Sequence, residues 1–460
     1  MKLFEQAQIG MLQLRNRIVM PPMATLFGEM DGSVSSRLYQ YYIRRAEGGA
    51  GLIIVENTAV HPASVNYPCT LEIHHPRFEE GLKRLAAGIK QAGAAAAIQL
   101  FHPGRQIHPK YTGNFPVAPS PVPCPVMGGM PKELDAESIR LLVQSFVNGA
   151  GRARDAGFDA VEIHGAHGYL VAQFLSPFSN FRKDAYGGDA ERRARFAIEI
   201  IGGIRKRLGD DFPVFLRISA DEKVDGGLTL DETRRLVPLL EKGGYTALHV
   251  SAGCYPSMEW IVQPYLQPQG CLAGMAAEIR QVTDLPIIAV GRIGHPEVAE
   301  SILQNQNADL VSMGRALISD PDLPIKAAEK RFGQTRPYIG CNFCIQFVGS
   351  KQTRCAVNPL MGKEAEPSAS AADSGRILVV GGGPAGMEAA LTANASGHKV
   401  KLIEKRSHLG GQLKLAASLA SKPEFAQLLD FYIECLDRSG IELQLGRDFK
   451  LDALMEFRPD

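Results

Sequence analysis

Residues 161–169 read Val161-Glu162-Ile163-His164-Gly165-Ala166-His167-Gly168-Tyr169. A short β-branched run ends at His164, and His167 and Tyr169 follow at once. We interpret it as a strand that delivers two imidazoles and a phenol to its own C-terminal end, the end at which α/β folds carry out chemistry. Two hydrogen-bond donors beside one weak acid suit a site that holds a substrate oxygen while a proton is delivered nearby.

The same pattern of a buried-type strand followed by a helical stretch recurs along the first 331 residues. The predicted strands are Arg17–Met23, Gly51–Glu56, Ala97–Phe101, Ala160–His164, Val214–Ser219, Leu248–Ser251, Pro286–Gly291 and Leu310–Gly314. Amphipathic stretches such as Ala190–Leu208 and Leu230–Gly243 lie between them. This alternation predicts an α/β fold with a parallel sheet covered by helices. Eight such units favour a (β/α)8 TIM barrel over residues 1–331, with a doubly wound open sheet as the alternative.

The pattern changes after the barrel. Residues 332–361 form a Cys-rich segment, and residues 362–375 are rich in small and polar residues, which is typical of a linker. Residues 376–460 then restart with a strand that enters Gly381-x-Gly383-x-x-Gly386, a helix and the strand Val400–Glu404. This is the complete βαβ context of a Rossmann-like site for the ADP part of a dinucleotide. The domain is partial, and we expect either a natural short form or a fragment.

Composition narrows the function classes. The chain has 460 residues, 45% hydrophobic and 22% charged residues, and a net charge of +1, so nothing directs it toward nucleic acid or an anionic membrane. No apolar run is long enough to span a bilayer, and the N-terminus lacks the apolar run of a signal peptide. We therefore expect a cytoplasmic protein. Its eight cysteines then point first to metal rather than to disulfides.

Several motifs together resemble one family, the old yellow enzyme-like flavin reductases. The resemblance is to the iron–sulfur branch, typified by 2,4-dienoyl-CoA reductase, trimethylamine dehydrogenase and enoate reductases. The motifs that carry it are Arg17–Met23, Gln99–Arg105, His164–Tyr169, Ser179–Gly188, Val290–Arg292, Ser312–Arg315, Cys341–Cys344 with Cys355–Pro359, and Gly381–Gly386. The resemblance implies an FMN-containing barrel, an iron–sulfur segment and a flavin/nicotinamide module.

The resemblance also implies the reaction and the residues that perform it. Reduced FMN delivers hydride to the β-carbon of an activated alkene, His164 and His167 hold the carbonyl oxygen, and Tyr169 protonates the α-carbon. The implied FMN contacts are Met23 and Ala24 at the ring, Gln99 at the pyrimidine edge, Arg217 near the N1–C2 oxygen region, and Gly291, Arg292, Gly314 and Arg315 at the phosphate. The implied contacts to FAD or NAD(P)H are Gly381, Gly383, Ala385, Gly386, Glu404 and Gln412.

The cysteine group departs from the family pattern. Cys341, Cys344 and Cys355 have a ligand-type spacing, because thiolates at i and i+3 can reach one metal centre. The family usually has a fourth cysteine at the position of Tyr338. A 4Fe–4S cluster completed by tyrosinate, water or another ligand, a three-iron cluster, a lost cluster and a zinc site all stay open. We expect Cys254 to line the substrate mouth rather than to fill this position.

The leading hypothesis is an NAD(P)H-dependent ene-reductase that saturates the C=C bond of α,β-unsaturated carbonyl compounds. An amine dehydrogenase or demethylase on the same scaffold is the enzymatic alternative, and a non-catalytic flavin electron-transfer subunit is the alternative from another class. The expected partners are a small-molecule enone, enoate or enoyl substrate, a separate electron-donor protein and further copies of the chain.

Overall fold

Eight parallel strands close into a barrel, in the order β3-β4-β5-β8-β9-β10-β11-β12. The computed structural model describes residues 1–346, 352–366 and 374–460. The strands are β3 (Ile18–Met20), β4 (Leu52–Ala59), β5 (Ala95–Phe101), β8 (Ala160–Gly165), β9 (Val214–Ser219), β10 (Ala247–Ser251), β11 (Ile287–Ala289) and β12 (Leu310–Ser312). All eight predicted strands are present, and because β12 pairs with β3 the open-sheet alternative is wrong.

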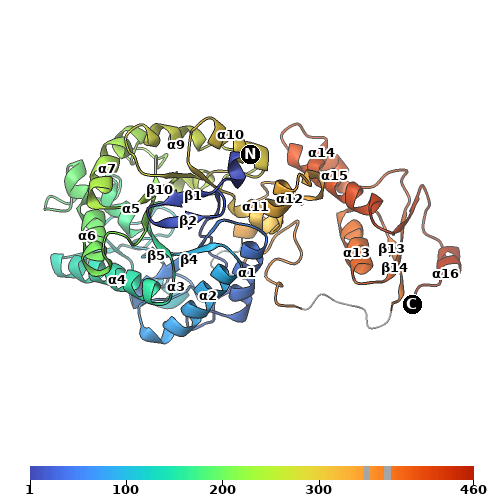
Figure 1. Ribbon diagram of the computed structural model, residues 1–460, viewed down its shortest axis with the longest axis horizontal. Coiled ribbons are helices and arrows are strands. Elements are labelled where there is room, and N and C mark those ends of the chain that lie inside the picture. The colour runs from blue at the N-terminus through green and yellow to red at the C-terminus, as the bar shows by residue number, and fades with distance from the viewer. Residues whose placement is uncertain (347–351, 367–373) are drawn as a thin grey trace.

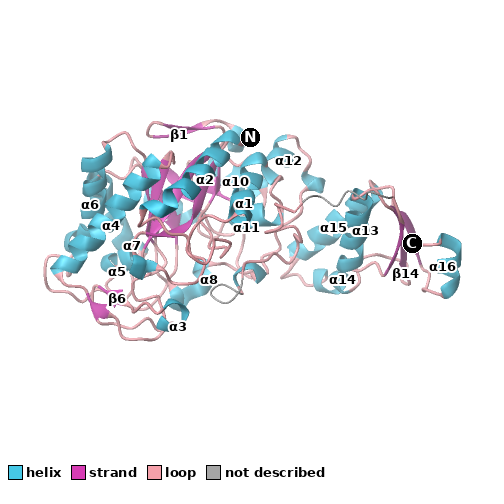
Figure 2. Cartoon of the chain, turned by 90° about the horizontal axis from the view of Figure 1, so that it is seen from below, coloured by secondary structure: helices cyan, strands magenta, loops and turns pink. Residues whose placement is uncertain are grey.

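Helices cover the outside of this barrel (Figures 1 and 2). The main ones are α1 (Ser36–Glu47), α2 (Glu79–Gln91), α4 (Ala136–Asp155), α6 (Ala190–Leu208), α7 (Leu230–Gly243), α9 (Ala273–Arg280), α10 (Pro296–Gln304), α11 (Gly314–Ser319) and α12 (Leu323–Ala328). Side-chain caps set several helix starts: Asp189 accepts from the N–H of Arg192 at 2.9 Å, and Thr229 forms a capping box with Glu232. Both predicted amphipathic helices, α6 and α7, have the predicted bounds.

An N-terminal hairpin closes one end of the barrel. Strands β1 (Ala7–Ile9) and β2 (Leu12–Leu14) pair antiparallel, and their apolar side chains join a core cluster with inward-facing strand residues such as Val19 and Ala97. The N-terminal end is therefore filled with side chains. Chemistry is left to the opposite end, where the carboxyl ends of the strands meet.

The C-terminal module has its own parallel sheet and its own core cluster. Its strands are β13 (Arg376–Val380), β14 (Lys399–Glu404) and β15 (Glu442–Leu445), and its helices are α13 (Pro384–Ala395), α14 (Gln412–Ala417), α15 (Pro423–Asp437) and α16 (Leu451–Phe457). The predicted strand–glycine–helix–strand order is confirmed. Figure 1 shows the module beside the barrel, next to α12.

Within the described part of the chain, two ion pairs join the module to the preceding residues. Arg292, after β11, pairs with Glu424 at the start of α15, and each side chain is 3% exposed. Arg336, in the Cys-rich segment, pairs with Glu388 of α13 at 2.7 Å. Two neighbouring residues of this segment pack into different hydrophobic cores: Tyr338 belongs to the barrel core and Ile339 to the module core.

Parts of two predicted segments lie outside the described residues, namely 347–351 of the Cys-rich segment and 367–373 of the linker. Among the helices of the described residues, none is long and apolar enough to cross a membrane.

Candidate active site

A cavity of ≈ 1060 Å³, counting the space at its open mouth, lies at the carboxyl ends of the barrel strands. The predicted barrel residues that line it are Met23, Ala24, Gln99, His164, His167, Tyr169, Arg217, Gly291, Arg292, Gly314 and Arg315. Every barrel residue that the sequence singled out for catalysis or FMN therefore faces one space. The sequence analysis missed three further lining residues that no recognisable motif marks, namely Asn57 of β4 and, on loops, Gln263 and Thr353.

The two imidazoles and the phenol lie against one another. The ring of His164 is 5.1 Å from that of His167 and 4.7 Å from that of Tyr169, centroid to centroid and edge to face. His167 has φ +62°, a left-handed conformation that costs energy for a non-glycine residue and is held here by its surroundings. Its backbone N–H donates to the Ser219 hydroxyl at 2.9 Å, and its Nε2 is 2.7 Å from the Ser251 hydroxyl. The cluster is thus fixed by β9 and β10.

Both imidazoles are neutral at physiological pH. Burial lowers the pKa of His164 and of His167 well below 6.5, and the nearby positive charge of Arg217 lowers both further. The Nδ1 of His164 accepts from the N–H of Ala166 at 3.4 Å, so the proton of the neutral ring sits on Nε2. His164 can therefore donate a hydrogen bond to a substrate oxygen without carrying a charge.

Tyr169 is an acid held in its protonated form. Burial raises its pKa to about 12, against a partial lowering by a hydrogen bond with Tyr255. Its ring packs edge-on against Phe101 with centroids 4.9 Å apart, which fixes the phenol beside the imidazoles. A phenol in this state can give up a proton only to a strongly basic centre, such as a developing carbanion.

A buried polar chain that the sequence analysis missed orients Gln99. The amide of Gln99 donates to Glu162 at 2.8 Å, the other oxygen of Glu162 is 2.8 Å from Nδ1 of His249, and Nε2 of His249 is 3.0 Å from the Ser312 hydroxyl. Four strands contribute one residue each. A glutamate within the buried run of β8 was the only signal in the sequence for such a network.

Arg217 brings a buried positive charge to the cavity. The one hydrogen bond of its guanidinium among the described residues is the 3.4 Å contact from Nη1 to the carbonyl of Pro22, and its Nε is buried without a partner. Burial lowers its pKa below the ordinary value of an arginine, and the negative charge of Glu162 opposes this. A buried guanidinium with unused donors fits an anionic or carbonyl-rich ligand.

The two predicted phosphate arginines differ in their partners. Arg315 donates to the carbonyl of Gln263 at 2.7 Å and to the side chain of Asn342. Arg292 pairs with Glu424 of the module, while its Nε is buried without a partner. Gly291 precedes Arg292 at φ +113°, where a Cβ would lie 2.5 Å from Leu272 Cγ, so this loop requires glycine. Arg292 keeps spare donors for an anion in the cavity.

The three cysteines of the 332–361 segment gather around a second, small cavity of ≈ 280 Å³, which Tyr338 and Arg315 also line. Tyr338 and Cys344 line the large cavity as well, so the two spaces are neighbours. Among the described residues, however, no group of three or more His, Cys, Asp or Glu side chains is arranged to hold a metal ion. The thiols are close to one another but do not form a ready ligand set.

The glycine motif of the module forms a tight strand-to-helix turn. A Cβ at Gly386 would lie 1.9 Å from the carbonyl oxygen of Gly381, so the helix approaches the strand as only glycine permits. Glu404 accepts from the N–H groups of Gly382 at 2.7 Å and Arg406 at 2.9 Å, which lowers its pKa. The other predicted residues of the module lie at helix N-termini. Gly383 is the N-cap of α13, Ala385 lies in the first turn of α13, and Gln412 is the first residue of α14. None of the predicted module residues lines the barrel cavity.

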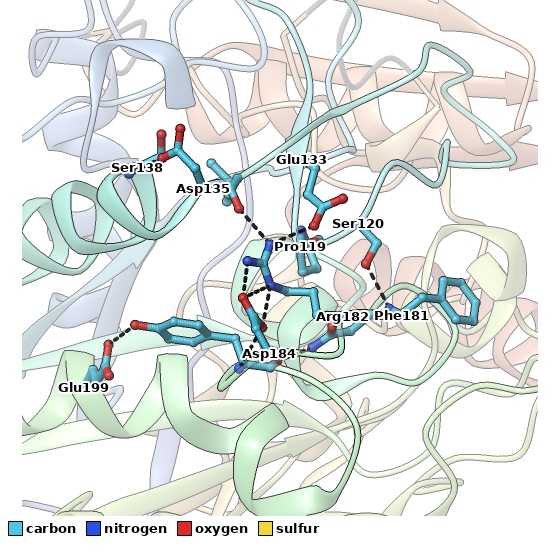
Figure 3. A network of polar contacts seen from close by, with 12 residues as sticks. Pro119, Ser120, Glu133, Asp135, Ser138, Phe181, Arg182, Asp184 and Glu199 are labelled. Carbon is cyan, nitrogen blue, oxygen red and sulfur yellow. Dashed lines mark hydrogen bonds and ion pairs between the residues drawn. The ribbon is translucent and has the colours of Figure 1, made fainter.

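The family motif Ser179–Gly188 is a structural clamp rather than part of the cavity lining. Figure 3 shows Arg182 at its centre. Its guanidinium donates to the carbonyls of Pro119 at 2.9 Å and Leu134 at 2.7 Å and pairs with Asp184, and Ser120 accepts from the N–H of Phe181 at 2.9 Å. The clamp fixes the long connection between β5 and α4 over the barrel rim.

Comparison with known proteins identifies the family of this chain. Residues 2–334 match the family described as NADH:flavin oxidoreductase / NADH oxidase, and residues 376–423 match that described as FAD dependent oxidoreductase. The chain belongs to the NADH:flavin oxidoreductase / NADH oxidase family. The resemblance inferred from the motifs is thereby confirmed.

Three similar proteins match almost the whole of this chain. The chain is 45% identical to an NADH oxidase of Thermoanaerobacter brockii, over 100% of this chain and 71% of that protein. It superposes on 2-naphthoyl-CoA reductase with a TM-score of 0.95 at 30% identity, covering 100% of this chain and 73% of the other. It superposes on histamine dehydrogenase from Rhizobium sp. 4-9 with a TM-score of 0.90 at 30% identity, covering 99% and 67%.

Proposed function

We propose that this member of the family reduces the C=C bond of α,β-unsaturated carbonyl compounds. The observation that carries the proposal is the neutral imidazole pair beside a protonated phenol in one cavity. FMN bound in that cavity would supply a hydride to the β-carbon. His164 and His167 donate hydrogen bonds to the carbonyl oxygen, and Tyr169 passes its proton to the α-carbon. Because negative charge grows on that oxygen during the reaction, fixed donors stabilise the transition state more than the ground state.

Two features of the cavity support the proposal that it binds FMN. Its volume and the unpartnered Nε atoms of Arg217 and Arg292 leave room and donors for an anionic ligand. Met23 and Ala24 would contact the ring, Gln99 its pyrimidine edge, and Arg217 the region of N1 and the C2 oxygen. The loops after β11 and β12, with Gly291, Arg292, Gly314 and Arg315, would hold the phosphate, as such loops do in many barrels.

Amine oxidation is the second candidate, because histamine dehydrogenase has a similar structure. The charge of the cavity favours the first. Three arginines line it, Arg217, Arg292 and Arg315, and no Asp or Glu lines it among the described residues. A substrate that develops an oxyanion gains from this field, whereas an ammonium group finds no counter-charge. A flavin electron-transfer subunit without turnover is the remaining alternative.

The other predicted groups are part of the same proposal. The proposed domains are the barrel (residues 1–331), the cluster segment (332–361), the linker (362–375) and the dinucleotide module (376–460). The module would hold FAD or NAD(P)H through Gly381, Gly383, Ala385, Gly386, Glu404 and Gln412. The iron–sulfur ligands would be Cys341, Cys344 and Cys355, although their thiols form no ready ligand set among the described residues. Cytoplasmic location, homo-oligomer formation and a separate electron-donor protein stay predictions.

The test separates the two half-reactions of Tyr169→Phe by anaerobic stopped-flow spectroscopy. We expect FMN reduction by NADH at the wild-type rate, and reoxidation by 2-cyclohexenone or cinnamate slowed by about 10²-fold or more, the usual contribution of a general acid. Tyr245→Phe is the matched control, since that buried phenol donates to the carbonyl of Ala197 at 2.9 Å, away from the cavity. Equal losses in both half-reactions would refute the role of Tyr169. Turnover of trimethylamine or histamine without enone turnover would favour the second candidate.

A further inference from the structure

One inward-facing layer of the barrel is polar. The apolar cluster near the closed end of the barrel includes one residue from each of three alternate strands, β8, β10 and β12, namely Ala160, Ala247 and Leu310. Side chains alternate between the two faces of a strand, so the residues two positions further along point inward as well. Those residues are Glu162, His249 and Ser312, and all three are buried. Side chains from alternate strands form one layer of a barrel interior, and such layers are usually apolar.

This layer belongs to a hydrogen-bonded chain that reaches the cavity at both ends. Gln99 donates from its amide nitrogen to one oxygen of Glu162 at 2.8 Å, and the other oxygen is 2.8 Å from Nδ1 of His249. Nε2 of His249 is 3.0 Å from the hydroxyl of Ser312. Gln99 and Ser312 line the cavity, whereas Glu162 and His249 do not. Because each member is hydrogen-bonded, the chain is a rigid support below the cavity rather than a loose polar group in the core.

The chemistry of these groups fixes the direction of each hydrogen bond. A carboxylate only accepts, so Glu162 takes an N–H of Gln99 and the Nδ1–H of His249. Burial lowers the pKa of His249, so the ring is neutral and its Nε2 accepts from the Ser312 hydroxyl. Since the amide nitrogen of Gln99 is committed to Glu162, the amide oxygen is the end left for the cavity. Among the described residues, no donor makes a hydrogen bond to that oxygen.

We propose that Glu162 and His249 are positioning residues that hold the amide oxygen of Gln99 toward the cavity, as the acceptor for the imide N–H of a flavin. The inference rests on the proposed binding of FMN. The two ends of a carboxamide have nearly the same shape, so an unsupported glutamine presents either its NH₂ or its oxygen. Glu162 removes this choice before FMN binds, and a group that is already ordered loses less entropy on binding.

Two other roles of the polar layer predict different behaviour. If Glu162 only balanced the buried charge of Arg217, removing its charge would change FMN affinity whether or not position 99 carries an amide. If the layer only filled the barrel, its substitution would change the free energy of unfolding and leave FMN affinity unchanged. Only a positioning role makes the effect of Glu162 on FMN affinity depend on Gln99.

A double-mutant cycle on the FMN dissociation constant of the full chain tests the proposal, with Glu162→Gln, Gln99→Leu and the double variant. Glu162→Gln keeps the shape of the side chain but can offer an NH₂ as well as an oxygen, so the amide of Gln99 is no longer fixed. We expect binding to weaken by about tenfold, the equivalent of roughly one hydrogen bond, and no further loss when Glu162→Gln is added to Gln99→Leu.

Glu222→Gln is the matched control. Glu222 is a second buried glutamate, which accepts from the N–H of Leu228 at 2.9 Å and does not line the cavity. The same substitution there should leave the FMN dissociation constant at the wild-type value. A loss as large as that of Glu162→Gln would show that any buried carboxylate supports the site equally, which would overturn the proposal.

His249→Gln keeps the test available if Glu162→Gln does not fold, because it retains the charge of Glu162 and removes the ring that fixes the second carboxylate oxygen. We expect a smaller loss of FMN affinity, again absent in the Gln99→Leu background. Equal losses in both backgrounds, or wild-type affinity in Glu162→Gln and His249→Gln alike, overturn the positioning role. A wild-type protein that binds FMN but reduces no enone refutes the proposed reaction and leaves this inference standing, whereas one that binds no FMN refutes both.

Discussion

In the barrel, strand register alone brings His164 of β8 beside Arg217 of β9 and Gln99 of β5 beside Glu162 of β8. In the Cys-rich segment, three thiols reach one small cavity but do not converge on a metal position within the described residues. The difference lies in what fixes each group. Buried parallel strands hold side chains in place without a ligand, whereas thiols on irregular backbone would reach a converging arrangement only with a bound metal.

The module stands between these two cases. Its glycine turn is formed by the backbone, but its strand β13 is only half-buried, and a buried ion pair, Arg292 with Glu424, fastens it to the barrel. We therefore expect the barrel and the module to respond separately to substitution.

The largest expected effect concerns the attachment of the module. Glu424→Gln leaves the guanidinium of Arg292 buried without a counter-charge, which should destabilise docking of α15 by about 3–5 kcal/mol in the flavin-free protein. Hydrogen exchange of α15 measures this. Adding FMN should recover part of the loss if its phosphate pairs with Arg292.

The matched control is Glu388→Gln, which breaks the more exposed pair with Arg336 in the same interface. That pair should contribute no more than about 1 kcal/mol. Similar hydrogen-exchange rates of α15 in both variants would show that the buried pair stabilises docking no more than the exposed pair does.

The next effect should be confined to the barrel. Burial raises the pKa of Glu56 to about 7, although it accepts a 2.6 Å hydrogen bond from Thr25. Between pH 4.5 and pH 7 the unfolded chain has lost this proton and the native barrel keeps it, so barrel stability falls as pH rises, by about 3 kcal/mol in all. Urea unfolding of Glu56→Gln across this range should lose that slope. If the pH dependence of stability persists in Glu56→Gln, it arises from other titrating groups.

The smallest effect should be confined to the module. Gly386→Ala places a Cβ against the carbonyl of Gly381 and should destabilise the module by about 1–3 kcal/mol, with the barrel unchanged. Gly383→Ala is the control, because its Cβ meets no atom within 4 Å. Thermal unfolding followed by module-specific hydrogen exchange distinguishes the two. Equal stability of both variants would mean that the turn relaxes more easily than its geometry indicates.

Strands and helices could be predicted from the sequence where each shows a clear local hydrophobic pattern. Strands such as β9, buried at every residue, were recognisable as apolar runs, and α6 and α7 were predicted with their observed bounds. Residues at strand ends, such as His164 and Arg217, were found because the barrel brings all strand ends to one rim.

Contacts between distant segments could not be predicted. Glu162 meets His249, 87 positions away, and Arg292 meets Glu424, 132 positions away. No local pattern in the sequence identifies which distant residue is the partner. The Tyr169–Tyr255 pair likewise joins two loops that only the barrel brings together. The Cys-rich segment has no periodicity from which its course could be inferred.

The most direct measurement is the flavin content of folded, purified protein, released by acid and identified by chromatography. The proposed chemistry requires about one FMN per chain, held at the barrel rim and lost when Arg217 is replaced by methionine while the fold is retained. Folded protein that yields no FMN, or that keeps its full complement without Arg217, would contradict it.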